Sequence, residues 1–412
     1  MLKQMEGSQA IAEAVALCRP GVVSCYPITP QTHIVEGLAA LVQAGKLPAT
    51  RLLNVESEFA SLSVMIGSAT SGARSYTATS SQGLLFMAEA VYNASGLRLP
   101  IVMTIGNRAI GAPINIWNDH SDSMALRDAG WLQLYAESNQ EALDLHIQAF
   151  RIAELVGVPV MVCVDGFILT HAIEQIDLPS QELVDRFLPP PRMRVRLDPA
   201  RPVTIGAMAG PDSYTETRVL LHRAHQQAIE VISQVQAEFT SLFGRSSGGL
   251  LAGYHADDAE TIVLALGSVN GTIQECVDVL RRRGQKIGSV KLCSYRPLPE
   301  TALRTALRGA RRVIVIEKNV QIGLGGALAR EVQNALHGAN VAVHSVIAGL
   351  GGRPITRVGV LNAIQEIETR KPSDTLFLDL NSDRVTVDEL RDREFVQGLW
   401  HAAAEVRGTA TV

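Results

Sequence analysis

The stretch that decides the fold runs from Glu56 to Gly83 and reads ESEFASLSVMIGSATSGARSYTATSSQG. It combines a pair of carboxylates, a helix rich in small residues, a short strand and a Ser/Gln/Gly turn. Small side chains let a helix approach a neighbouring strand or chain closely. Glu58 stands at the head of this helix, where free backbone N–H groups favour a carboxylate. The stretch predicts an acid held at a closely packed site, unless Glu56 and Glu58 only complement the helix N-terminus.

On both sides of this stretch, apolar β-branched runs alternate with helical patterns. The expected strands are VVSCYPIT from Val22, LLNVE, SYTATS, PIVMTIGN and VPVMVCVDGF. Such alternation is typical of a parallel sheet covered by helices on both faces. The sequence therefore predicts an α/β fold with a doubly wound parallel sheet. The helix before VPVMVCVDGF should begin at Ser138 with Glu141 in capping-box register, and His146 on it should face solvent or be satisfied locally.

Breaks in the pattern predict the domain organisation. Five prolines lie in residues 188–202, a long helical run covers roughly Tyr214 to Phe243, and glycines and serines in residues 244–253 mark a flexible joint. Alternation of strands and helices then resumes up to about Lys371, followed by less regular, charge-rich sequence. We expect a first domain with its linker at 1–245, a smaller α/β domain at 246–390 and a C-terminal tail at 391–412.

Composition describes an ordinary soluble globular protein. The net charge is −4 and 47% of residues are hydrophobic, so no basic excess favours binding to nucleic acid or an anionic membrane. The apolar runs have the length of strands, well below the roughly 20 residues of a membrane span. The N-terminus reads as an amphipathic helix without the features of a signal peptide. We therefore expect no nucleic-acid partner, no membrane span and a cytoplasmic location.

The five cysteines are scattered, at Cys18, Cys25, Cys163, Cys276 and Cys293. No C-x-x-C pair occurs, so the spacing predicts neither a zinc site, an iron–sulfur cluster nor a disulfide framework within this chain.

Three polar clusters follow expected strands: YPITPQT, SSQG and the stretch from Asn107 to Trp131. Ligands of parallel α/β sheets bind beyond the C-terminal ends of strands, so these clusters should share one cleft. Pro27 and Pro30 flank Thr29 and should present its hydroxyl rigidly, unless Thr29 is only a turn residue.

Arg108 directly follows the strand PIVMTIGN. A guanidinium at a strand end offers bidentate recognition to a carboxylate or phosphate, although an ion pair with Asp119 or Asp122 is the simpler alternative. Asp119, His120 and Asp122 could also suggest a metal site, but they lack open-site spacing. We therefore expect a structured loop there and no metal site in this chain.

Two further motifs are weaker. The GLGG of Gly323 to Gly326 lies between an expected strand and a helix, but its spacing is not the G-x-G-x-x-G of a dinucleotide site. VDGF, from Val164, has one part of a magnesium-diphosphate motif without its first Gly and its Asn pair. Neither motif predicts a phosphate cradle, and an NAD-dependent dehydrogenase would rest on GLGG alone.

Taken together, YPITPQT, the Glu56–Gly83 stretch and RAIGAPINIWNDHSDSMALRDAGW resemble the α subunit of the 2-oxoacid:acceptor oxidoreductases, the pyruvate:ferredoxin oxidoreductase family. The resemblance covers about Glu6 to Leu350. It implies a thiamine-diphosphate-binding, pyrimidine-type domain followed by a domain similar to the C-terminal domain of transketolase. It also implies oxidative decarboxylation of a 2-oxo acid to its acyl-CoA. The 2-oxo acid is expected to be pyruvate or an aromatic acid such as phenylglyoxylate.

Functional residues follow from the same resemblance. Glu58 matches the cofactor-activating glutamate, with Glu56 as the alternative, and Thr29 and Arg108 match residues that contact the substrate carboxylate. Asn115 is implied as a further substrate-binding residue, and the cofactor-binding set is completed by Pro27, Ile28, Ser81 and Gln82.

The resemblance implies an incomplete site in this chain. Thiamine diphosphate with Mg²⁺ would be held jointly with a β subunit that carries the diphosphate motif, and iron–sulfur clusters would lie in γ and ferredoxin-like subunits. Coenzyme A is the expected co-substrate, and a flavoprotein subunit is expected where NAD is the acceptor. The alternative from another class is a scaffold subunit that keeps the fold without catalysis.

Overall fold

The computed structural model describes residues 1–191 and 196–408, with side chains up to Gln397. Its first sheet has seven strands in the order β12-β6-β7-β5-β4-β2-β3. Every neighbouring pair is parallel except β12 with β6. The strands are β2 (Val22–Cys25), β3 (Arg51–Asn54), β4 (Ser75–Thr79), β5 (Ile101–Asn107), β6 (Leu132–Tyr135), β7 (Val160–Asp165) and β12 (Ser294–Arg296). The predicted doubly wound parallel sheet is confirmed, and only its β12 edge runs antiparallel.

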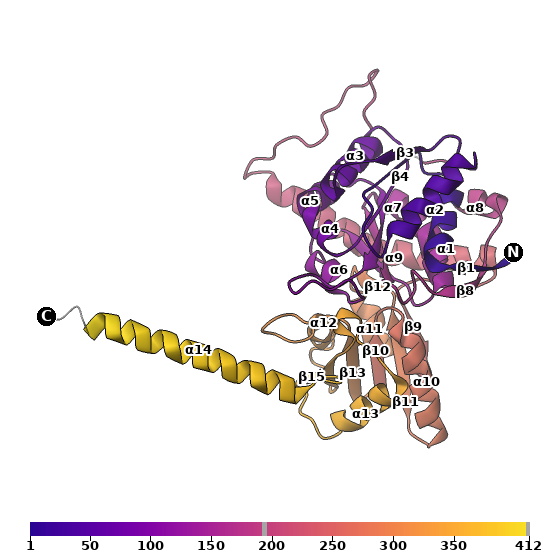
Figure 1. Cartoon of the computed structure of the whole chain (residues 1–412). Coiled ribbons are helices and arrows are strands. Elements are labelled where there is room, and N and C mark those ends of the chain that lie inside the picture. Colours follow the sequence, from indigo (N-terminus) through magenta and orange to yellow (C-terminus); the bar gives the residue numbers. More distant parts are fainter. Residues whose placement is uncertain (192–195, 409–412) are drawn as a thin grey trace. The chain divides into compact units, whose positions relative to one another are not determined.

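Helices cover both faces of this sheet (Figure 1). One layer contains α1 (Gly7–Leu17), α2 (Thr32–Gln43), α7 (Asn139–Val156) and α9 (Tyr214–Phe243), with α8 (Gln181–Phe187) packed on α9. The other layer contains α3 (Glu58–Thr70), α4 (Ser81–Phe86), α5 (Ala88–Gly96) and α6 (Ser121–Ala125). Leu38 and Phe150 belong to the core beneath the first layer, and Leu62 and Met65 to the core beneath the second. The long helix predicted over Tyr214 to Phe243 is confirmed.

The start of α7 follows the predicted cap. The Ser138 side chain accepts a hydrogen bond from the Glu141 N–H at 3.2 Å, whereas the Glu141 carboxylate accepts from the Glu137 N–H rather than from that of Ser138. His146 on this helix is fully buried and bonds the Thr104 hydroxyl and the Ala142 carbonyl, each at 2.6 Å. Burial lowers the pKa of His146 to about 4. His146 is therefore a satisfied core residue, and the solvent-facing alternative is wrong.

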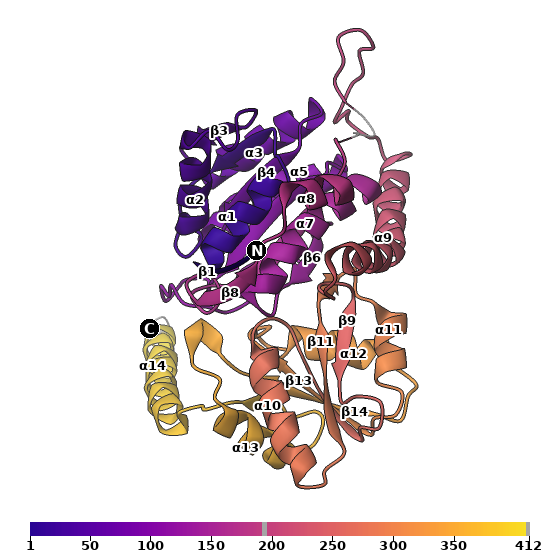
Figure 2. The same cartoon turned by 90° about the vertical axis from the view of Figure 1, so that its right-hand side faces the viewer.

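The N-terminal segment departs from the prediction. Residues Leu2–Glu6 form strand β1, which pairs antiparallel with β8 (Ile173–Asp177), and α1 begins only at Gly7 (Figure 2). The predicted amphipathic helix is therefore wrong over the first six residues. Exposed Leu2 and Ile173 explain the error, since this ribbon buries little apolar surface from which a pattern could be read.

A second sheet has the order β15-β14-β13-β10-β11-β9. β9 pairs antiparallel with β11, while β14, β13, β10 and β11 run parallel. Its strands are β9 (Leu251–Tyr254), β10 (Thr261–Ala265), β11 (Ile287–Leu292), β13 (Arg312–Glu317), β14 (Ala342–Ile347) and β15 (Leu376–Phe377). The remaining helices of this half are α10 (Val269–Arg282), α11 (Glu300–Ala306), α12 (Ala327–Ala335), the 3₁₀ turn η1 (Leu350–Gly352) and α13 (Arg357–Ile367). This sheet and its helices lie within residues 246–390, where a smaller α/β domain is predicted, and that domain stays a prediction.

Asp165 connects the two sheets. It ends β7, is 1% exposed, and accepts from the Lys318 ammonium at 2.5 Å, the His120 ring at 2.6 Å and the Ser268 N–H at 2.9 Å. Burial acts to raise the pKa of Asp165, but Lys318 and His120 hold it well below its ordinary value. The VDGF motif thus supplies a buried anion that joins the first sheet to the loops after β10 and β13.

Contacts divide the chain into one unit spanning Met1–Leu376 and a second spanning Phe377–Val412. The second contains α14 (Ser382–Gly408). The boundary expected after residue 390 therefore falls inside a helix, and this part of the predicted division is replaced by one at Leu376. We keep the first boundary, at 245, as a proposal, since it lies between α9 and β9. Among the described residues, no helix is long and apolar enough to cross a membrane.

Candidate active site

The three polar clusters meet at one edge of the first sheet. β5, β4 and β2 are consecutive parallel strands, so their C-terminal ends lie side by side. A Cβ added to Gly106 of β5 would stand 3.0 Å from the Ser80 hydroxyl, which follows β4, and 3.5 Å from Pro30, which follows β2. The predicted convergence of these strand ends is therefore present in the structure.

The helix α3 is anchored at this edge by a small residue. The ladder between β2 and β4 ends at Val23 and Tyr76, so the two strands separate toward their C-termini. The Ser61 hydroxyl bonds the Ser24 carbonyl of β2 at 2.7 Å and the Thr77 hydroxyl of β4 at 3.0 Å. A Leu at this position could neither fit so closely nor make these bonds. Glu58, one turn earlier, is consequently placed at the opening between β2 and β4.

Glu58 is the buried acid of the triplet, with 6% of its surface exposed, whereas Glu56 is exposed. Ser57 caps α3 by accepting the Ala60 N–H at 3.1 Å. In the described part of the chain, no hydrogen bond reaches the Glu58 carboxylate. A Cβ added to Gly83 would stand 2.5 Å from Glu58 Oε1 and 2.6 Å from Thr79 Oγ1. The carboxylate therefore rests on the SSQG turn, in space that only glycine leaves open.

Three buried polar atoms at this edge of the sheet have no hydrogen-bond partner among the described residues, and one of them, Thr79 Oγ1, lies near the Glu58 carboxylate. Thr79 Oγ1 and Ser80 Oγ are both buried and neither has a hydrogen-bond partner, and the same holds for Gln31 Oε1. Buried polar groups are nearly always paired in folded proteins. The site therefore retains hydrogen-bonding capacity for a polar ligand next to Glu58.

Ser81 and Gln82 shape the turn beneath the carboxylate. Ser81 has a positive φ of 49° and donates its hydroxyl to the Ala109 carbonyl at 2.5 Å. A Cβ added to Gly111 would lie 3.0 Å from the Gln82 amide nitrogen. Both predicted cofactor-binding residues thus lie at the strand-end edge, and the Ser81 hydroxyl already ties the turn to the loop after β5.

Asp122 fixes that same turn to the end of β5. Its carboxylate is fully buried and accepts from the N–H groups of Ser81 (2.8 Å) and Arg108 (3.1 Å), as well as from the Asn107 amide (2.8 Å). Burial raises the pKa of Asp122 to about 6, and these hydrogen bonds oppose the shift. Sequence analysis did not predict that Asp122 positions this turn, although the sequence shows an Asp in the segment that follows the buried strand β5.

Arg108 lies next to this network with only 7% of its surface exposed. Its guanidinium donates to the Thr29 carbonyl at 2.9 Å and the Asn115 carbonyl at 3.2 Å. Among the described residues it pairs with no carboxylate, so the alternative of an ion pair with Asp119 or Asp122 is wrong. Burial lowers the pKa of Arg108, and Asp122 opposes that shift. A buried cation without an anion is the strongest indication of an anionic ligand at this site.

The other predicted substrate residues are placed differently. Thr29 and Pro27 are exposed and Ile28 is half-buried, so the Thr29 hydroxyl is open while its carbonyl holds Arg108. The Asn115 amide donates to the Gly351 carbonyl at 3.1 Å and accepts from the Trp117 N–H at 2.8 Å. Asn115 therefore joins its loop to the second α/β half, with both ends of its amide engaged.

The remaining candidates form no cofactor or metal site. Asp119 accepts from the Ser121 and Gly351 N–H groups, while His120 bonds Asp165, so the Asp119–Asp122 segment does not converge on an ion. At GLGG, the Glu317 carboxylate accepts the Leu328 and Ala329 N–H groups of α12 at 2.9 and 3.0 Å. A carboxylate thus occupies the helix N-terminus where a dinucleotide phosphate would bind.

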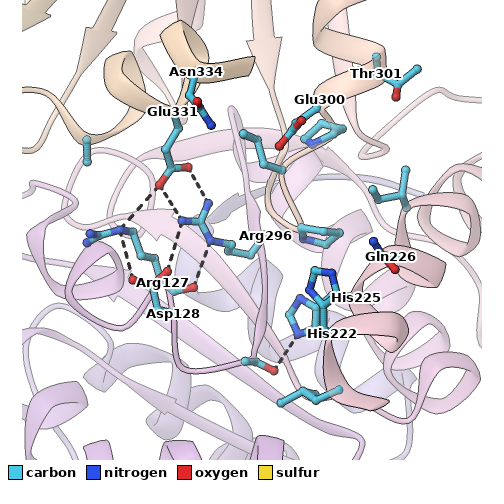
Figure 3. Close-up of a pocket in the computed structure, with 18 of the residues that line it drawn as sticks. Arg127, Asp128, His222, His225, Gln226, Arg296, Glu300, Thr301, Glu331 and Asn334 are labelled. Carbon is cyan, nitrogen blue, oxygen red and sulfur yellow. Dashed lines mark hydrogen bonds and ion pairs between the residues drawn. The ribbon is translucent and has the colours of Figure 1, made fainter. Parts of the chain in front are cut away.

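A cleft of about 880 Å³ lies between α9, the segment after β12 and α12 (Figure 3). Its charged groups are largely paired with one another: Arg296 bonds Glu331 through two contacts of 2.7 Å, and Arg127 lies 3.8 Å from Asp128. None of the predicted site residues lines this cleft. The candidate active site is instead the open edge around Glu58 and Arg108.

Comparison with protein families agrees with this fold. A family described as pyruvate flavodoxin/ferredoxin oxidoreductase, thiamine-diphosphate-binding, matches residues 13–237, and the pyruvate:ferredoxin oxidoreductase core domain II matches residues 259–360. Fold and family together define the class as a thiamine-diphosphate-type α/β oxidoreductase subunit. The chain belongs to the 2-oxoacid:ferredoxin oxidoreductases as an α-type subunit, since curated relatives of that kind match almost its whole length.

Two such relatives show the range of the family. The pyruvate synthase subunit PorA of Methanosarcina barkeri is 46% identical over 388 residues, covering 92% of this chain and 96% of the relative. The ketoisovalerate oxidoreductase subunit VorA of Pyrococcus abyssi is 41% identical over 367 residues, covering 88% and 92%.

A solved structure shares the fold. The 2-oxoglutarate:ferredoxin oxidoreductase of Magnetococcus marinus superposes with a TM-score of 0.66 at 20% identity. The match covers 89% of this chain and 65% of that one, so this chain spans about two thirds of that protein's length.

Proposed function

We propose that this chain is the α subunit of a thiamine-diphosphate-dependent enzyme that oxidatively decarboxylates a 2-oxo acid to its acyl-CoA. The observation that carries the proposal is Glu58, a buried carboxylate that accepts no hydrogen bond from the described residues and rests on Gly83 beside the unpartnered Thr79 hydroxyl. Pyruvate is the first candidate substrate because a relative named as pyruvate synthase subunit PorA is 46% identical to this chain, and branched-chain and aromatic acids such as phenylglyoxylate follow.

The residues around Glu58 fit the aminopyrimidine of thiamine diphosphate. A flat heterocycle with ring nitrogens and an amino group needs an acid and several hydrogen-bonding groups, and Glu58, Thr79 and Ser80 offer them unused. Pro27, Ile28, Ser81 and Gln82 would complete the wall of the cofactor site. When bound, the cofactor supplies the means to stabilise a carbanion.

Glu58 itself would hold a proton at its carboxyl oxygen and exchange it with the ring nitrogen of the pyrimidine. Such positioned general acid–base action contributes roughly 10²- to 10⁴-fold in rate. The burial of Glu58 excludes bulk water from this proton, while the Ser57 cap and the Ser61 contacts keep α3, and with it the carboxylate, in place.

Arg108 would bind the carboxylate of the 2-oxo acid. Its guanidinium is held by two backbone carbonyls rather than by an acid, so its charge remains available to an anion. The Thr29 hydroxyl lies on the exposed side of the carbonyl that holds Arg108 and would add a donor. Asn115 would not contact the substrate directly. Its side-chain amide would instead hold in place the loop whose backbone carbonyl, that of Asn115, accepts from Arg108.

The site would be completed by partner subunits. Tyr26, Phe59 and Phe86 expose 38%, 38% and 61% of their surfaces near the ends of β2, α3 and α4, an apolar rim suited to a second chain. A β subunit would hold the diphosphate and Mg²⁺, and iron–sulfur clusters would lie in γ and ferredoxin-like subunits because the five buried cysteines here are far apart in sequence. The acceptor would be ferredoxin, with NAD requiring an additional flavoprotein subunit, and the cytoplasmic location stays a proposal.

Replacing Glu58 with Gln in the reconstituted complex tests the function. The rate of coenzyme A-dependent pyruvate oxidation should fall about 100-fold or more, because Gln cannot exchange the proton. Glu56→Gln, two residues away and exposed, is the matched control and should keep full activity. Full activity of Glu58→Gln would instead favour a scaffold subunit.

A further inference from the structure

A second cluster of potential ligands lies at the N-terminal ribbon. Glu6 ends β1, His33 is in the first turn of α2, and His171 lies in the loop between β7 and β8. One donor atom from each of the three residues lies within 4.8 Å of the other two. Three segments that are far apart in sequence therefore direct two imidazoles and one carboxylate to one point.

Contacts within the cluster orient each ring. His33 Nδ1 lies 2.7 Å from Glu6 Oε1, and His171 Nδ1 lies 2.8 Å from the Thr170 hydroxyl, with the two ring centroids 4.8 Å apart. The contact with Thr170 fixes the His171 ring and leaves its other nitrogen as a ligand. At His33, a metal would replace the contact between Nδ1 and Glu6 Oε1 by binding both atoms.

We propose that Glu6, His33 and His171 form a binding site for a divalent transition metal of the zinc class. Two histidines and a carboxylate are a recurrent protein ligand set for Zn²⁺, and a water completes four-coordination. Tetrahedral ligand atoms around Zn²⁺ are about 3.3 Å apart. The three donors lie within 4.8 Å of one another, so a small rearrangement of their side chains would be needed. The side chains of His33 and Glu6 are 43% and 24% exposed, which leaves room for this movement and for the water.

The site would stabilise the segment that carries the substrate end of the active site. His33 follows Pro30 and Thr29 by a few residues, and the His171 ring lies tilted against Phe167, with the ring centroids 4.7 Å apart. Next to Phe167, a Cβ added to Gly166 would stand 2.7 Å from Pro30. A metal bridging Glu6, His33 and His171 would tie the β1–β8 ribbon to both segments that hold Pro30.

The test is zinc binding by the full-length chain after removal of metals with chelator. Isothermal titration with Zn²⁺ should give one equivalent, and Co²⁺ in its place should give the intense visible absorption of a four-coordinate site. His33→Gln and His171→Gln should each weaken Zn²⁺ binding at least tenfold, and Glu6→Gln should weaken it less. His255→Gln is the matched control, because His255 is half exposed and lies 3.9 Å from an acid, Asp278.

The proposal is overturned if the unmodified chain binds no Zn²⁺, or if His33→Gln, His171→Gln and Glu6→Gln all bind it as His255→Gln does. Circular dichroism of each variant shows whether it folds, and any two folded site variants decide the outcome. The result is independent of thiamine and of oxo-acid turnover, so it separates this site from the proposed function.

Discussion

Glu58 and Arg108 are positioned by backbone groups rather than by opposite charges. The Ser57 cap and the bonds of Ser61 set the first turn of α3, while the carbonyls of Thr29 and Asn115 hold the guanidinium. An internal ion pair would have neutralised both groups. Because each keeps its capacity to interact, Glu58 would be available to a cofactor that offers a basic nitrogen and Arg108 to a substrate that offers a carboxylate.

Gly83→Ala should displace the Glu58 carboxylate without unfolding the chain. The added Cβ would meet Glu58 Oε1 at 2.5 Å, so the carboxylate must move, and a displacement of about 1 Å can cost roughly 100-fold in rate. Activity of the reconstituted complex and thermal unfolding are measured together. Gly96→Ala, where a Cβ meets nothing within 4 Å, is the control; equal activity of both variants would refute the role of the Gly83 cradle.

Arg108→Lys should raise KM for the 2-oxo acid about 10- to 100-fold with a smaller change in kcat. A lysine keeps the charge but loses the planar fork that two carbonyls and a carboxylate can share. Steady-state kinetics across pyruvate concentrations measure this split. Arg151→Lys on α7, whose Arg lies 3.7 Å from Glu238, should behave like the unmodified enzyme. An unchanged KM in Arg108→Lys would exclude Arg108 as the carboxylate-binding group.

At the scale of single elements, the buried Glu317 carboxylate has a structural role. At the start of α12, Glu317 is 2% exposed, and a Cβ added to Gly326 would overlap its carboxylate. Burial raises the pKa of Glu317 to about 7, although the N–H groups of the helix lower it. The glycines of GLGG therefore allow β13 and α12 to pack closely around a buried carboxylate. The spacing of the glycines alone could not distinguish this arrangement from a phosphate-binding loop.

Glu317 should make stability depend on pH. Because its folded pKa is raised above the unfolded value, its contribution is full below about pH 4 and is lost as the pH rises to about 7. The free energy of unfolding of the native chain relative to Glu317→Gln should therefore fall by about 3 kcal/mol between pH 4 and pH 8. Urea unfolding at both pH values measures the difference. A constant difference would show that Glu317 titrates normally.

Elements with strong patterns were predictable from sequence, and contacts between distant residues were not. β5 and β7 are continuous apolar runs and α9 has helical periodicity, so their identities follow from local sequence. The meeting of the strand ends at Glu58 followed from parallel topology. By contrast, β1 is an exposed ribbon, and residues 382–397 of α14 are charge-rich and exposed, so neither of these stretches has a buried face to read. The Asn115–Gly351 bond joins residues 236 apart, which no local pattern encodes.

At the scale of the whole molecule, the two α/β halves share a buried hydrophobic cluster that includes Tyr135 and Tyr295, and buried polar contacts add to it. Lys318 and Asp165 form an ion pair of 2.5 Å with side chains 3% and 1% exposed. Gly351 and Gly352 admit Asn115 and Trp117 of the first half, and β12 returns to the first sheet. These contacts fix the loop after β5, so the second half would support the proposed substrate end of the site from a distance.

Asp165→Asn should destabilise the chain by about 3–5 kcal/mol, because it leaves the Lys318 ammonium buried without its counter-ion. The double variant Asp165→Asn/Lys318→Met should recover part of this loss, since it buries neither charge. The folded pKa of Asp165 is depressed, so its stabilisation is present above about pH 4 and disappears as the pH falls through the folded value. Urea unfolding at pH 7 measures all three chains, and equal stability of both variants would show that the charges are uncoupled.

The central claim is that Glu58 moves a proton on the pyrimidine of bound thiamine diphosphate. The most direct measurement is the rate at which the assembled enzyme, without substrate, exchanges the thiamine C2 proton for deuterium, followed by acid quench and proton NMR. We predict that Glu58→Gln slows this exchange about 100-fold or more while Glu56→Gln leaves it unchanged. Exchange at the unmodified rate in Glu58→Gln, with the cofactor still bound, would contradict the account.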